Sequence, residues 1–397
     1  MEHTLEWILT RGVAEVIVKE ELLAKLRAGK PLRLKQGFDP SKPNLHVGHA
    51  VGLRKLRQLQ DLGHQVVLIV GDWTAQIGDP SGRDESRTML TADEVKANAQ
   101  TYMDQFFHVV DKSRTVVRWQ SEWYSKFTLT DVFNLTSRFT LAQLMAHETF
   151  RKRWESGSPL TLMELMYPLL QAYDSIAIEA DVEFGGMDQK FNNLFGRELQ
   201  SMLGQRPQDV FLVPLLPGLD GRKMSKSYGN TVDLNLPPED MYGKLMSISD
   251  EMLMEYLTLV TDIPDDELAR IETDLRAGAV NPRDVKMRLG REVVGYIHSP
   301  EVAARAEAEF VRVFQRRELP TEIRQYDYSP GSVNWPKVIV DNNLATSASA
   351  ARRLIEQGGV RLDNQQVDSL EGFLDREAVL QVGKRGFLRL RPKREEP

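Results

Sequence analysis

Residues 37–49 have the sequence GFDPSKPNLHVGH, which leads directly into a long helical pattern. Pro40 and Pro43 prevent a strand or a helix from running through this segment, so the chain must turn here. From residue 48 to residue 62 apolar side chains recur at helical spacing, and Asn44 is the expected cap of that helix. The segment therefore predicts a tight turn that opens a helix.

Two histidines and a glycine stand at the start of this predicted helix. His46, Gly48 and His49 would lie where free backbone N–H groups and the helix dipole favour an anion. A glycine lets a flat ligand approach the backbone, and imidazole groups can donate to phosphate oxygens. On these residues alone, a phosphate site and an ordinary loop-to-helix junction both remain open.

A second segment narrows this choice. Residues 221–230, GRKMSKSYGN, form a doubly basic loop that by itself indicates only a solvated surface. HVGH followed by KMSKS, in that order along the chain, resembles the two signatures of the class I aminoacyl-tRNA synthetases. The resemblance implies that His46, His49, Lys223 and Lys226 are catalytic and contact ATP and its pyrophosphate while an amino acid is activated.

The composition is that of a globular protein large enough for two or three domains. The chain has 397 residues, of which 41% are hydrophobic and 27% are charged, and its net charge is −6. The absence of cysteine excludes disulfides, thiolate metal sites and cysteine nucleophiles. No apolar run is long enough for a membrane span, and residues 1–9 lack the pattern of a signal peptide. We therefore expect a cytoplasmic protein without membrane contact.

Strand patterns alternate with helical patterns over the first half of the chain. Residues 1–30 predict helix, and the candidate strands are residues 32–34, 65–70, 116–119, 182–184 and 211–213. This alternation predicts an α/β fold with a Rossmann-like parallel sheet, in which ligands bind beyond the carboxyl ends of the strands. Glycines or a glycine-containing loop follow several of these strands, namely at residues 37, 71, 185 and 217–227. We expect them to converge on one cleft. Neither GxGxxG after a strand nor a Walker A loop is present, which argues against dehydrogenase and P-loop folds.

We divide the chain into four parts. A Rossmann-like catalytic domain spans residues 1–236, with an inserted helical connective segment at about residues 121–180. Residues 237–317 show helical patterns with few strand signals and predict a helical domain. Residues 318–332 carry the prolines and glycine typical of a linker, and residues 333–397 combine a short capped helix with turn-and-strand patterns.

A polar turn follows the apolar strand at residues 65–70. It contains Asp79, Arg83 and Arg87 among Gly, Pro and Ser residues. One interpretation is a capped surface turn with an Asp–Arg pair. The other is a binding site, in which the carboxylate would bind a substrate ammonium group and the guanidinium groups would bind phosphate.

The helix predicted at residues 160–174 carries three polar side chains on one face. Tyr167, Gln171 and Asp174 lie at positions i, i+4 and i+7 and therefore share that face. All three form directional hydrogen bonds, so the face is either solvated or lines a pocket. The turn GGMDQ at residues 185–189 adds a carboxylate and an amide.

Taken together, these motifs make the chain similar to the bacterial tyrosyl-tRNA synthetases over nearly its whole length. The motifs that carry the resemblance are GFDP at 37–40, HVGH at 46–49, IGDPSGR at 77–83, the Tyr–Gln–Asp face, GGMDQ at 185–189 and KMSKS at 223–227. The resemblance implies that Asp174 binds the phenol of L-tyrosine. It also implies that the ammonium group is held by Tyr167, Gln171 and Asp79, and that Asp39 and Gln189 position the substrate.

The same resemblance implies an ATP site and a catalytic role for two arginines. The residues expected to bind ATP are Gly37, Asp39, His46, Gly48, His49, Gly186, Asp188, Gln189, Met224 and Lys226. Arg83 and Arg87 stand where the family places mobile basic residues that act on pyrophosphate. Mg²⁺ is expected to arrive with ATP, and the sequence shows no dedicated metal site.

The end of the chain implies a tRNA partner. Residues 331–397 carry 11 Lys and Arg against nine Asp and Glu, whereas the rest of the chain is acidic. Residues 333–397 resemble a small α+β RNA-binding fold of the alpha-L type, which implies that Arg352, Arg353 and Arg361 contact tRNA(Tyr). A solvated helix face is the alternative explanation for these arginines. The resemblance also implies a homodimer and places residues 237–317 on the anticodon side.

One position departs from the family pattern. Many members have a tyrosine two residues before the glycine of GFDP, where it shares the contact to the phenol, whereas this chain has Lys35. Two other functions stay open: a tryptophanyl-tRNA synthetase, and a synthetase-like RNA-binding protein without catalysis. Asp174 and the RNA-binding segment argue against the first, and the intact HVGH and KMSKS motifs argue against the second.

Overall fold

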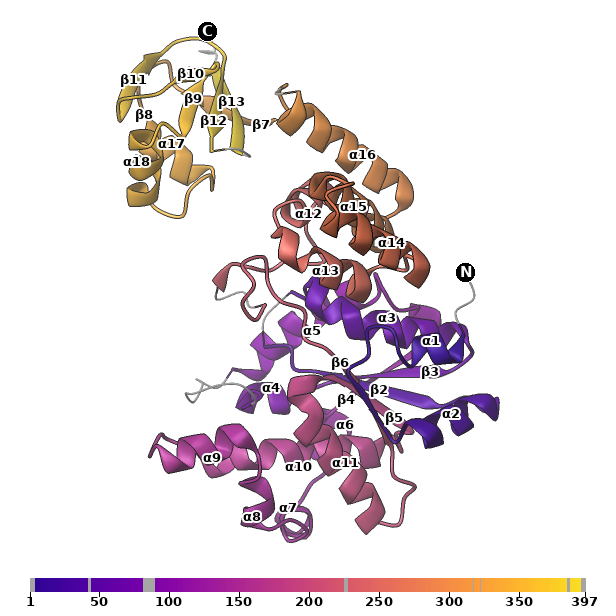
Figure 1. Ribbon diagram of the computed structural model, residues 1–397. Helices are drawn as coiled ribbons and strands as arrows, with labels where there is room; N and C mark the ends of the chain where they lie inside the picture. The colour runs from indigo at the N-terminus through magenta and orange to yellow at the C-terminus, as the bar shows by residue number, and fades with distance from the viewer. Residues whose placement is uncertain are drawn as a thin grey trace. The chain divides into compact units, whose positions relative to one another are not determined.

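The computed structural model describes residues 4–41, 44–80, 90–224, 228–316, 318–321, 323–383 and 386–393. The chain forms two compact units, Met1–Glu307 and Ala308–Pro397 (Figure 1). The first unit contains a central sheet with helices on both faces, followed by a group of helices. The second unit is a small sheet with two helices.

The sheet of the first unit has six strands in the order β1-β6-β5-β2-β3-β4. The strands are β1 (Glu15–Ile17), β2 (Arg33–Phe38), β3 (Gln65–Val70), β4 (Thr115–Trp119), β5 (Val182–Gly186) and β6 (Asp209–Val213). All neighbours are parallel except β1, which pairs antiparallel with β6 at the edge. The predicted parallel α/β fold is therefore confirmed, with one antiparallel edge strand added.

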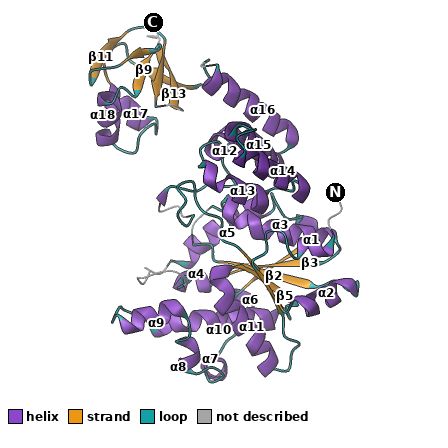
Figure 2. Ribbon diagram, viewed as in Figure 1, coloured by secondary structure: helices purple, strands orange, loops and turns teal. Residues whose placement is uncertain are grey.

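Helices cover both faces of this sheet (Figure 2). Those that accompany it are α1 (Leu5–Ile8), α2 (Lys19–Arg27), α3 (Val47–Asp61), α4 (Thr74–Ile77), α5 (Ala92–Phe106), α6 (Ser121–Tyr124), α7 (Leu129–Thr136), α8 (Leu141–Leu144), α9 (Glu148–Glu155), α10 (Leu162–Ala177) and α11 (Lys190–Met202). Short 3₁₀ turns, η1 (Lys112–Arg114) and η2 (Met187–Gln189), precede β4 and follow β5. Helix α3 lies on one face, and α10 and α11, which pack against each other, lie on the other.

The strand order places a switch point between β2 and β5. From β2 the chain continues to β3 on one side, whereas β5 and β6 pair on the other side of β2. Connections that diverge in this way leave a crevice at the carboxyl ends of the two central strands. The fold therefore positions a site next to Phe38 and Gly186, the last residues of β2 and β5.

The prediction of helix across residues 1–30 is wrong in its middle part. Residues 15–17 form β1, because their backbone groups complete the edge of β6 in the register Val16↔Phe211. A stretch of three residues is too short for its side-chain spacing to separate strand from helix, so only the pairing partner decides. Gly37 also lies inside β2 and not after it.

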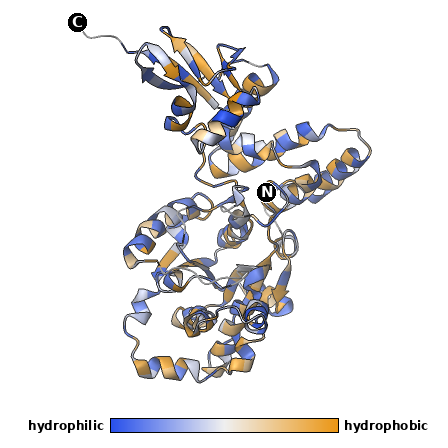
Figure 3. Ribbon diagram, turned by 90° about the vertical axis from the view of Figure 1, so that its left-hand side faces the viewer, coloured by the Kyte–Doolittle hydropathy of each residue, from blue (hydrophilic) through white to orange (hydrophobic). Residues whose placement is uncertain are grey.

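A group of helices completes the first unit. Its members are α12 (Pro238–Leu245), η4 (Asp250–Met252), α13 (Leu253–Val260), α14 (Asp265–Arg276) and α15 (Pro282–Ile297), and α16 (Pro300–Phe310) with the π-helical turn η5 (Val311–Gln315) leads into the second unit. Polar and apolar residues alternate along these helices, as expected for elements with one buried and one exposed face (Figure 3).

The buried guanidinium group of Arg11 ties the amino-terminal segment to this helical group. It donates to the carbonyl oxygens of Thr258 at 3.1 Å and Ile263 at 2.5 Å, and it pairs with Asp265 at 2.6 Å. The carbonyl groups at the end of α13 lack helical partners, so these bonds satisfy acceptors that would otherwise be buried and unpaired.

The second unit is built on a five-stranded sheet with the order β10-β9-β12-β13-β7, together with the pair β11-β8. Its elements are β7 (Arg324–Tyr328), β8 (Gly331–Asn334), α17 (Trp335–Asp341), α18 (Ala348–Glu356), β9 (Val360–Leu362), β10 (Gln365–Gln366), β11 (Glu371–Leu374), β12 (Ala378–Val382) and β13 (Gly386–Pro392). Leu380, Leu388 and Ile339 lie at the centre of its apolar core.

Part of the predicted linker at residues 318–332 is sheet. Residues 324–328 form β7, which pairs parallel with β13, and residues 331–334 form β8. The two prolines of this segment, Pro320 and Pro330, both fall outside the strands, where a missing N–H group breaks no ladder. The prolines therefore lie on either side of β7, and the segment between them is not a continuous linker.

Candidate active site

The carboxyl ends of the central strands surround a cavity of ≈ 370 Å³. Fourteen of the residues predicted from the sequence line it: Gly37, Asp39, His46, Gly48, His49, Asp79, Tyr167, Gln171, Asp174, Gly186, Asp188, Gln189, Lys223 and Met224. The structure thus brings together segments that are almost 190 residues apart in the chain. The predicted Arg83, Arg87 and Lys226 lie outside the described residues.

The buried carboxylate of Asp174, from α10, forms one wall of the cavity. It accepts hydrogen bonds from Gln120 Nε2 at 2.7 Å, Trp123 Nε1 at 3.2 Å and the Tyr124 hydroxyl at 3.4 Å. Burial raises the pKa of Asp174 to about 7, and the positive charge of Lys35 opposes this rise. Asp174 is therefore an oriented acceptor whose charge changes close to neutral pH.

Gln120, which was not among the predicted site residues, sets the orientation of this carboxylate. Gln120 Oε1 accepts from the backbone N–H groups of Trp73 at 3.2 Å and Thr74 at 3.0 Å, so its Nε2 must face Asp174. Gln120 also lines the cavity. The available signal was its place directly after Trp119, the last residue of β4.

Two further carboxylates are held in the same cavity. Asp39 accepts from the Tyr167 hydroxyl at 2.8 Å and from Thr74 Oγ1 at 2.6 Å, and Asp79 accepts from Gln189 Nε2 at 2.6 Å. Burial and then the charge of Asp39 raise the pKa of Tyr167 well above its usual range, so this hydroxyl stays a donor. The cavity therefore offers a cluster of acidic groups that suits an ammonium ion.

Lys35 lies behind the cavity wall and does not line the cavity. It is fully buried on β2, and its Nζ is 2.9 Å from Glu183 Oε1 on β5. Lys35 therefore pairs with a carboxylate of the neighbouring strand and does not extend into the cavity. Strand periodicity alone does not reveal this pairing, because it depends on the register Lys35↔Glu183.

The HVGH segment caps α3 in a different way from the one predicted. His46 is the N-cap residue, with extended backbone, whereas Asn44 Nδ2 donates to Asp233 at 3.2 Å; the prediction of Asn44 as the cap is wrong. Asn44 is too far from the helix because Leu45 and His46 separate it from the first helical residue, Val47. The two histidines thus lie at the helix start, as expected.

The tautomer of His49 follows from a backbone contact. The N–H group of His46 donates to His49 Nδ1 at 3.1 Å, so a neutral His49 carries its proton on Nε2. A Cβ atom at Gly48 would lie 2.9 Å from His46 Nδ1 and 3.4 Å from the sulfur of Met224. Glycine at this position therefore allows the histidines and the KMSKS segment to lie close together.

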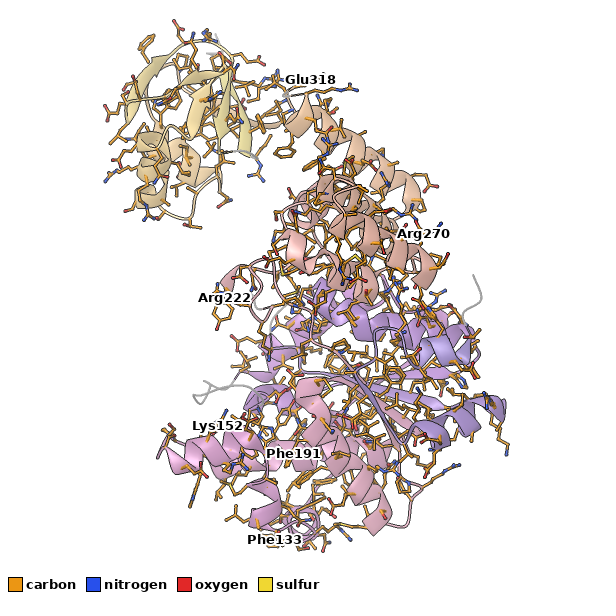
Figure 4. The ribbon with its side chains drawn as sticks, in the orientation of Figure 1. Phe133, Lys152, Phe191, Arg222, Arg270 and Glu318 are labelled. Carbon is orange, nitrogen blue, oxygen red and sulfur yellow. The ribbon has the colours of Figure 1, made fainter. Side chains whose placement is uncertain are left out.

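Lys223 of the KMSKS segment contacts the acidic residue of the GGMDQ turn. Lys223 Nζ is 3.1 Å from Asp188 Oδ2, and both side chains line the cavity. A Cβ atom at Gly186 would lie 2.8 Å from Asp188 Oδ1. In the same loop Arg222 pairs with Asp220 at 2.5 Å and points outward from the first unit (Figure 4).

The three arginines predicted to contact RNA lie on the surface of the second unit. Arg352 and Arg353 are exposed on α18, and Arg361 is exposed on β9, where it donates to Asn364 at 3.4 Å. Ser347 caps α18 by accepting from the backbone of Ala350, so this helix has the predicted start.

The described residues contain neither a membrane-spanning helix nor a cluster of metal-ligating side chains. No helix there is long and apolar enough to cross a membrane. No group of three or more His, Cys, Asp or Glu side chains in the same residues is arranged to hold a metal ion.

The known proteins that this chain resembles are tRNA synthetases. The model of the family "tRNA synthetases class I (W and Y)" matches residues 27–315. The "Tyrosine--tRNA ligase" of Dehalococcoides mccartyi strain 195 is 53% identical over 97% of this chain and 98% of its own. That of Thermotoga maritima is 48% identical over 96% of each chain.

Solved structures share the fold at low identity. A C-terminally truncated mitochondrial tyrosyl-tRNA synthetase of Aspergillus nidulans has a TM-score of 0.63 at 23% identity, over 77% of this chain and 92% of that one. The tryptophanyl-tRNA synthetase of Plasmodium falciparum has a TM-score of 0.56 at 15% identity, over 73% and 80%. Because the family model and the close relatives cover most of the chain, the chain belongs to the class I tRNA synthetases, among the bacterial tyrosyl-tRNA synthetases.

Proposed function

We propose that the cavity activates L-tyrosine with ATP and that the tyrosyl group then passes to the 3′-terminal adenosine of tRNA(Tyr). The observation that carries this assignment of residues is Asp174, a buried and oriented carboxylate in the cavity wall. A phenol can donate to Asp174, while the ammonium group of the same substrate contacts Asp79, Tyr167 and Gln171. Asp39 and Gln189 hold the residues around it, through the hydrogen bonds to Tyr167 and Asp79.

The first step requires alignment more than acid–base chemistry. The carboxylate of tyrosine attacks the α-phosphate of ATP, a P–O bond to the carboxylate forms, and the P–O bond to pyrophosphate breaks. A carboxylate is already a nucleophile at neutral pH, so no general base is needed. The cost lies in the charge that develops on the phosphates, which preorganised donors stabilise.

The HVGH and KMSKS segments supply such donors. His49 offers Nε2–H, His46 and Gly48 lie at the start of α3 with its positive dipole end, and Lys223 supplies an ammonium group. We propose that pyrophosphate is also contacted by Lys226, Arg83 and Arg87, which are not among the described residues. Gly37, Gly186, Asp188 and Met224 would line the adenosine and phosphate path. Mg²⁺ would arrive bound to the ATP phosphates, where it would neutralise part of their charge.

In the second step a ribose hydroxyl of the tRNA attacks the carbonyl carbon of tyrosyl-adenylate, and AMP leaves. We propose that Arg352, Arg353 and Arg361 hold phosphates of tRNA(Tyr), because they are exposed cations on a folded unit. These partners are those of translation, so we also propose a cytoplasmic location.

We propose that the protein acts as a homodimer. Five large apolar side chains between residues 129 and 162 are 57% to 81% exposed: Leu129, Phe133, Leu141, Trp154 and Leu162. They come from α7, α8, α9 and the start of α10, which lie together in the first unit, with Phe133 at its outer edge (Figure 4). Exposed apolar side chains in such number on one region support a protein partner, and a second copy of this chain is the proposed one.

Amino-acid-dependent exchange between ATP and pyrophosphate, measured without tRNA for all twenty amino acids, tests the proposed reaction. We expect exchange with tyrosine alone, and loss of selection against phenylalanine in Asp174→Asn. Exchange with tryptophan would overturn the assignment of Asp174. No exchange from folded protein would favour an RNA-binding role without catalysis.

A further inference from the structure

A buried ion pair lies at the wall of the proposed tyrosine site, where Glu183 lines the cavity and Lys35 does not. Lys35 on β2 and Glu183 on β5 are neighbours in the sheet, and both side chains are at most 2% exposed. Lys35 Nζ is 2.9 Å from Glu183 Oε1, 2.9 Å from the backbone oxygen of Gln171 and 2.7 Å from Ser175 Oγ. An ammonium group has three N–H donors, so Lys35 has a full set of partners without any ligand.

Glu183 in turn fixes the side chain of Gln171. Glu183 Oε1 accepts from Gln171 Nε2 at 3.1 Å, and Glu183 Oε2 accepts from Ser175 Oγ at 3.3 Å and from Gln208 Nε2. A carboxylate can only accept, so the Gln171 amide turns its NH₂ group toward Glu183, and the side-chain amide of Asn193 lies 3.0 Å from the same nitrogen. The amide oxygen of Gln171 is then the atom that this side chain offers to the cavity, which it lines.

We propose that Lys35 and Glu183 are positioning residues for tyrosine: they hold the Gln171 amide in the one orientation in which its oxygen accepts a hydrogen bond from the substrate ammonium group. This inference rests on the tyrosine site proposed above. It gives Lys35 a role in recognition that involves no contact with the phenol. It also assigns Glu183, which the sequence analysis did not identify as part of the site.

The orientation matters because the two faces of an amide have opposite polarity. If Gln171 turned by 180°, its NH₂ group would face the ammonium group, and two donors would oppose each other. Lys35 holds the Glu183 carboxylate in place through its contact with Oε1, and it anchors α10 through the Gln171 carbonyl oxygen. Without Lys35, Glu183 would lose this anchor and could turn away from Gln171, so the orientation of the amide would no longer be enforced.

The surroundings leave this network little freedom to rearrange. Helix α11 passes it at Gly196, where a Cβ atom would lie 2.6 Å from Gln208 Nε2 and 2.9 Å from Ser175 Oγ. A buried ion pair is often no more stabilising than apolar residues of similar volume. Stability alone therefore does not account for two buried charges at this point, whereas control of a substrate-binding amide does.

Equilibrium binding with two ligands tests the proposal. The ligands are tyrosine and its analogue without the amino group, 3-(4-hydroxyphenyl)propionate. The test variants are Lys35→Met and the neutral double variant Lys35→Met/Glu183→Met, which removes the pair without leaving a buried charge. We expect the dissociation constant of tyrosine to rise about tenfold in both, the scale of one hydrogen bond to a charged group. The affinity for the analogue should stay at the wild-type value in the double variant, because it removes together the charges of Lys35 and Glu183, whose effects on the pKa of Asp174 are opposite.

A second buried pair in the same sheet region provides the matched control. Lys25 Nζ is 2.7 Å from Asp209 Oδ2, both side chains are at most 6% exposed, and neither lines the cavity. The variant Lys25→Met/Asp209→Met should bind both ligands as the wild type does. It controls for any general effect of replacing a buried ion pair with apolar side chains.

Three outcomes would overturn the positioning role. These are wild-type tyrosine affinity in the folded double variant, an equal loss for both ligands in that double variant, and an equal loss in the Lys25/Asp209 control. A wild-type protein that binds neither ligand would instead refute the tyrosine site itself. The two failures are therefore distinguishable.

Discussion

Asp174 should make tyrosine binding depend on pH between about 6 and 8, the range around its pKa. Burial raises this pKa to about 7, so the group is protonated below that pH and ionised above it. The ionised form is the better acceptor for a phenol, and binding should therefore strengthen as the pH rises. About one-eleventh of the protein is ionised one unit below the pKa and about ten-elevenths one unit above, so the apparent dissociation constant should fall about tenfold from pH 6 to pH 8.

Binding of tyrosine is measured by calorimetry or equilibrium dialysis without ATP. No phosphate is then present that the histidines and the KMSKS loop could contact. Tyr124 and Tyr167 do not interfere, because burial raises their pKa values well above the usual range. The variant Asp174→Asn should bind more weakly and lose the pH dependence. A wild-type profile that is flat over this range, or an equal slope in Asp174→Asn, would refute the assignment of the phenol contact to an ionising Asp174.

Three other substitutions test separate parts of the molecule. Lys223→Ala should lower the rate of tyrosine activation by about 10²-fold with little change in tyrosine affinity, because one preorganised charge is lost at the phosphates. The control in the exchange assay is Arg222→Ala, because Arg222 is adjacent in sequence but pairs with Asp220; this variant should keep the wild-type rate. Phe133→Asp should convert the proposed dimer to a monomer in sedimentation. Phe373→Asp, which changes a side chain that is 74% exposed on the second unit, should leave the dimer intact. A dimeric Phe133→Asp protein would contradict the proposed interface. Gly196→Ala should lower the thermal midpoint and weaken tyrosine binding, because its Cβ atom would press on Gln208 and Ser175; unchanged melting would show that the network can move.

The sequence predicted the parallel α/β sheet and many of the residues that line the cavity for a physical reason. Strands of a parallel sheet end on one edge, so glycines and polar residues at their carboxyl ends meet regardless of their distance in the chain. Gly71 after β3, GGMDQ at the end of β5 and Lys223 after β6 follow this rule. The helical face of Tyr167, Gln171 and Asp174 was predictable because a single periodicity determines it.

What the sequence did not predict depends on pairing across the fold. The edge strand β1 exists because β6 offers an unpaired edge, and the partner of Lys35 depends on the register between β2 and β5. Gln120 is similar, because its amide orientation is set by the backbone N–H groups of Trp73 and Thr74 at the start of α4. Residue type and local spacing carry no information about such partners.

The charges of the cavity are distributed so that binding also aligns the reaction. Asp39, Asp79 and Asp174 gather where the amino acid is proposed to lie, and His49 and Lys223 line the same cavity. A zwitterion would turn its ammonium group toward the acidic cluster and thus its carboxylate away from it, toward the basic groups that are proposed to hold the phosphates. The attacking oxygen would therefore approach the α-phosphate because of the same field that binds the substrate. In this arrangement the orientation of Gln171 matters for the rate as well as for affinity, because a rotated ammonium group would also move the carboxylate away from its line of attack.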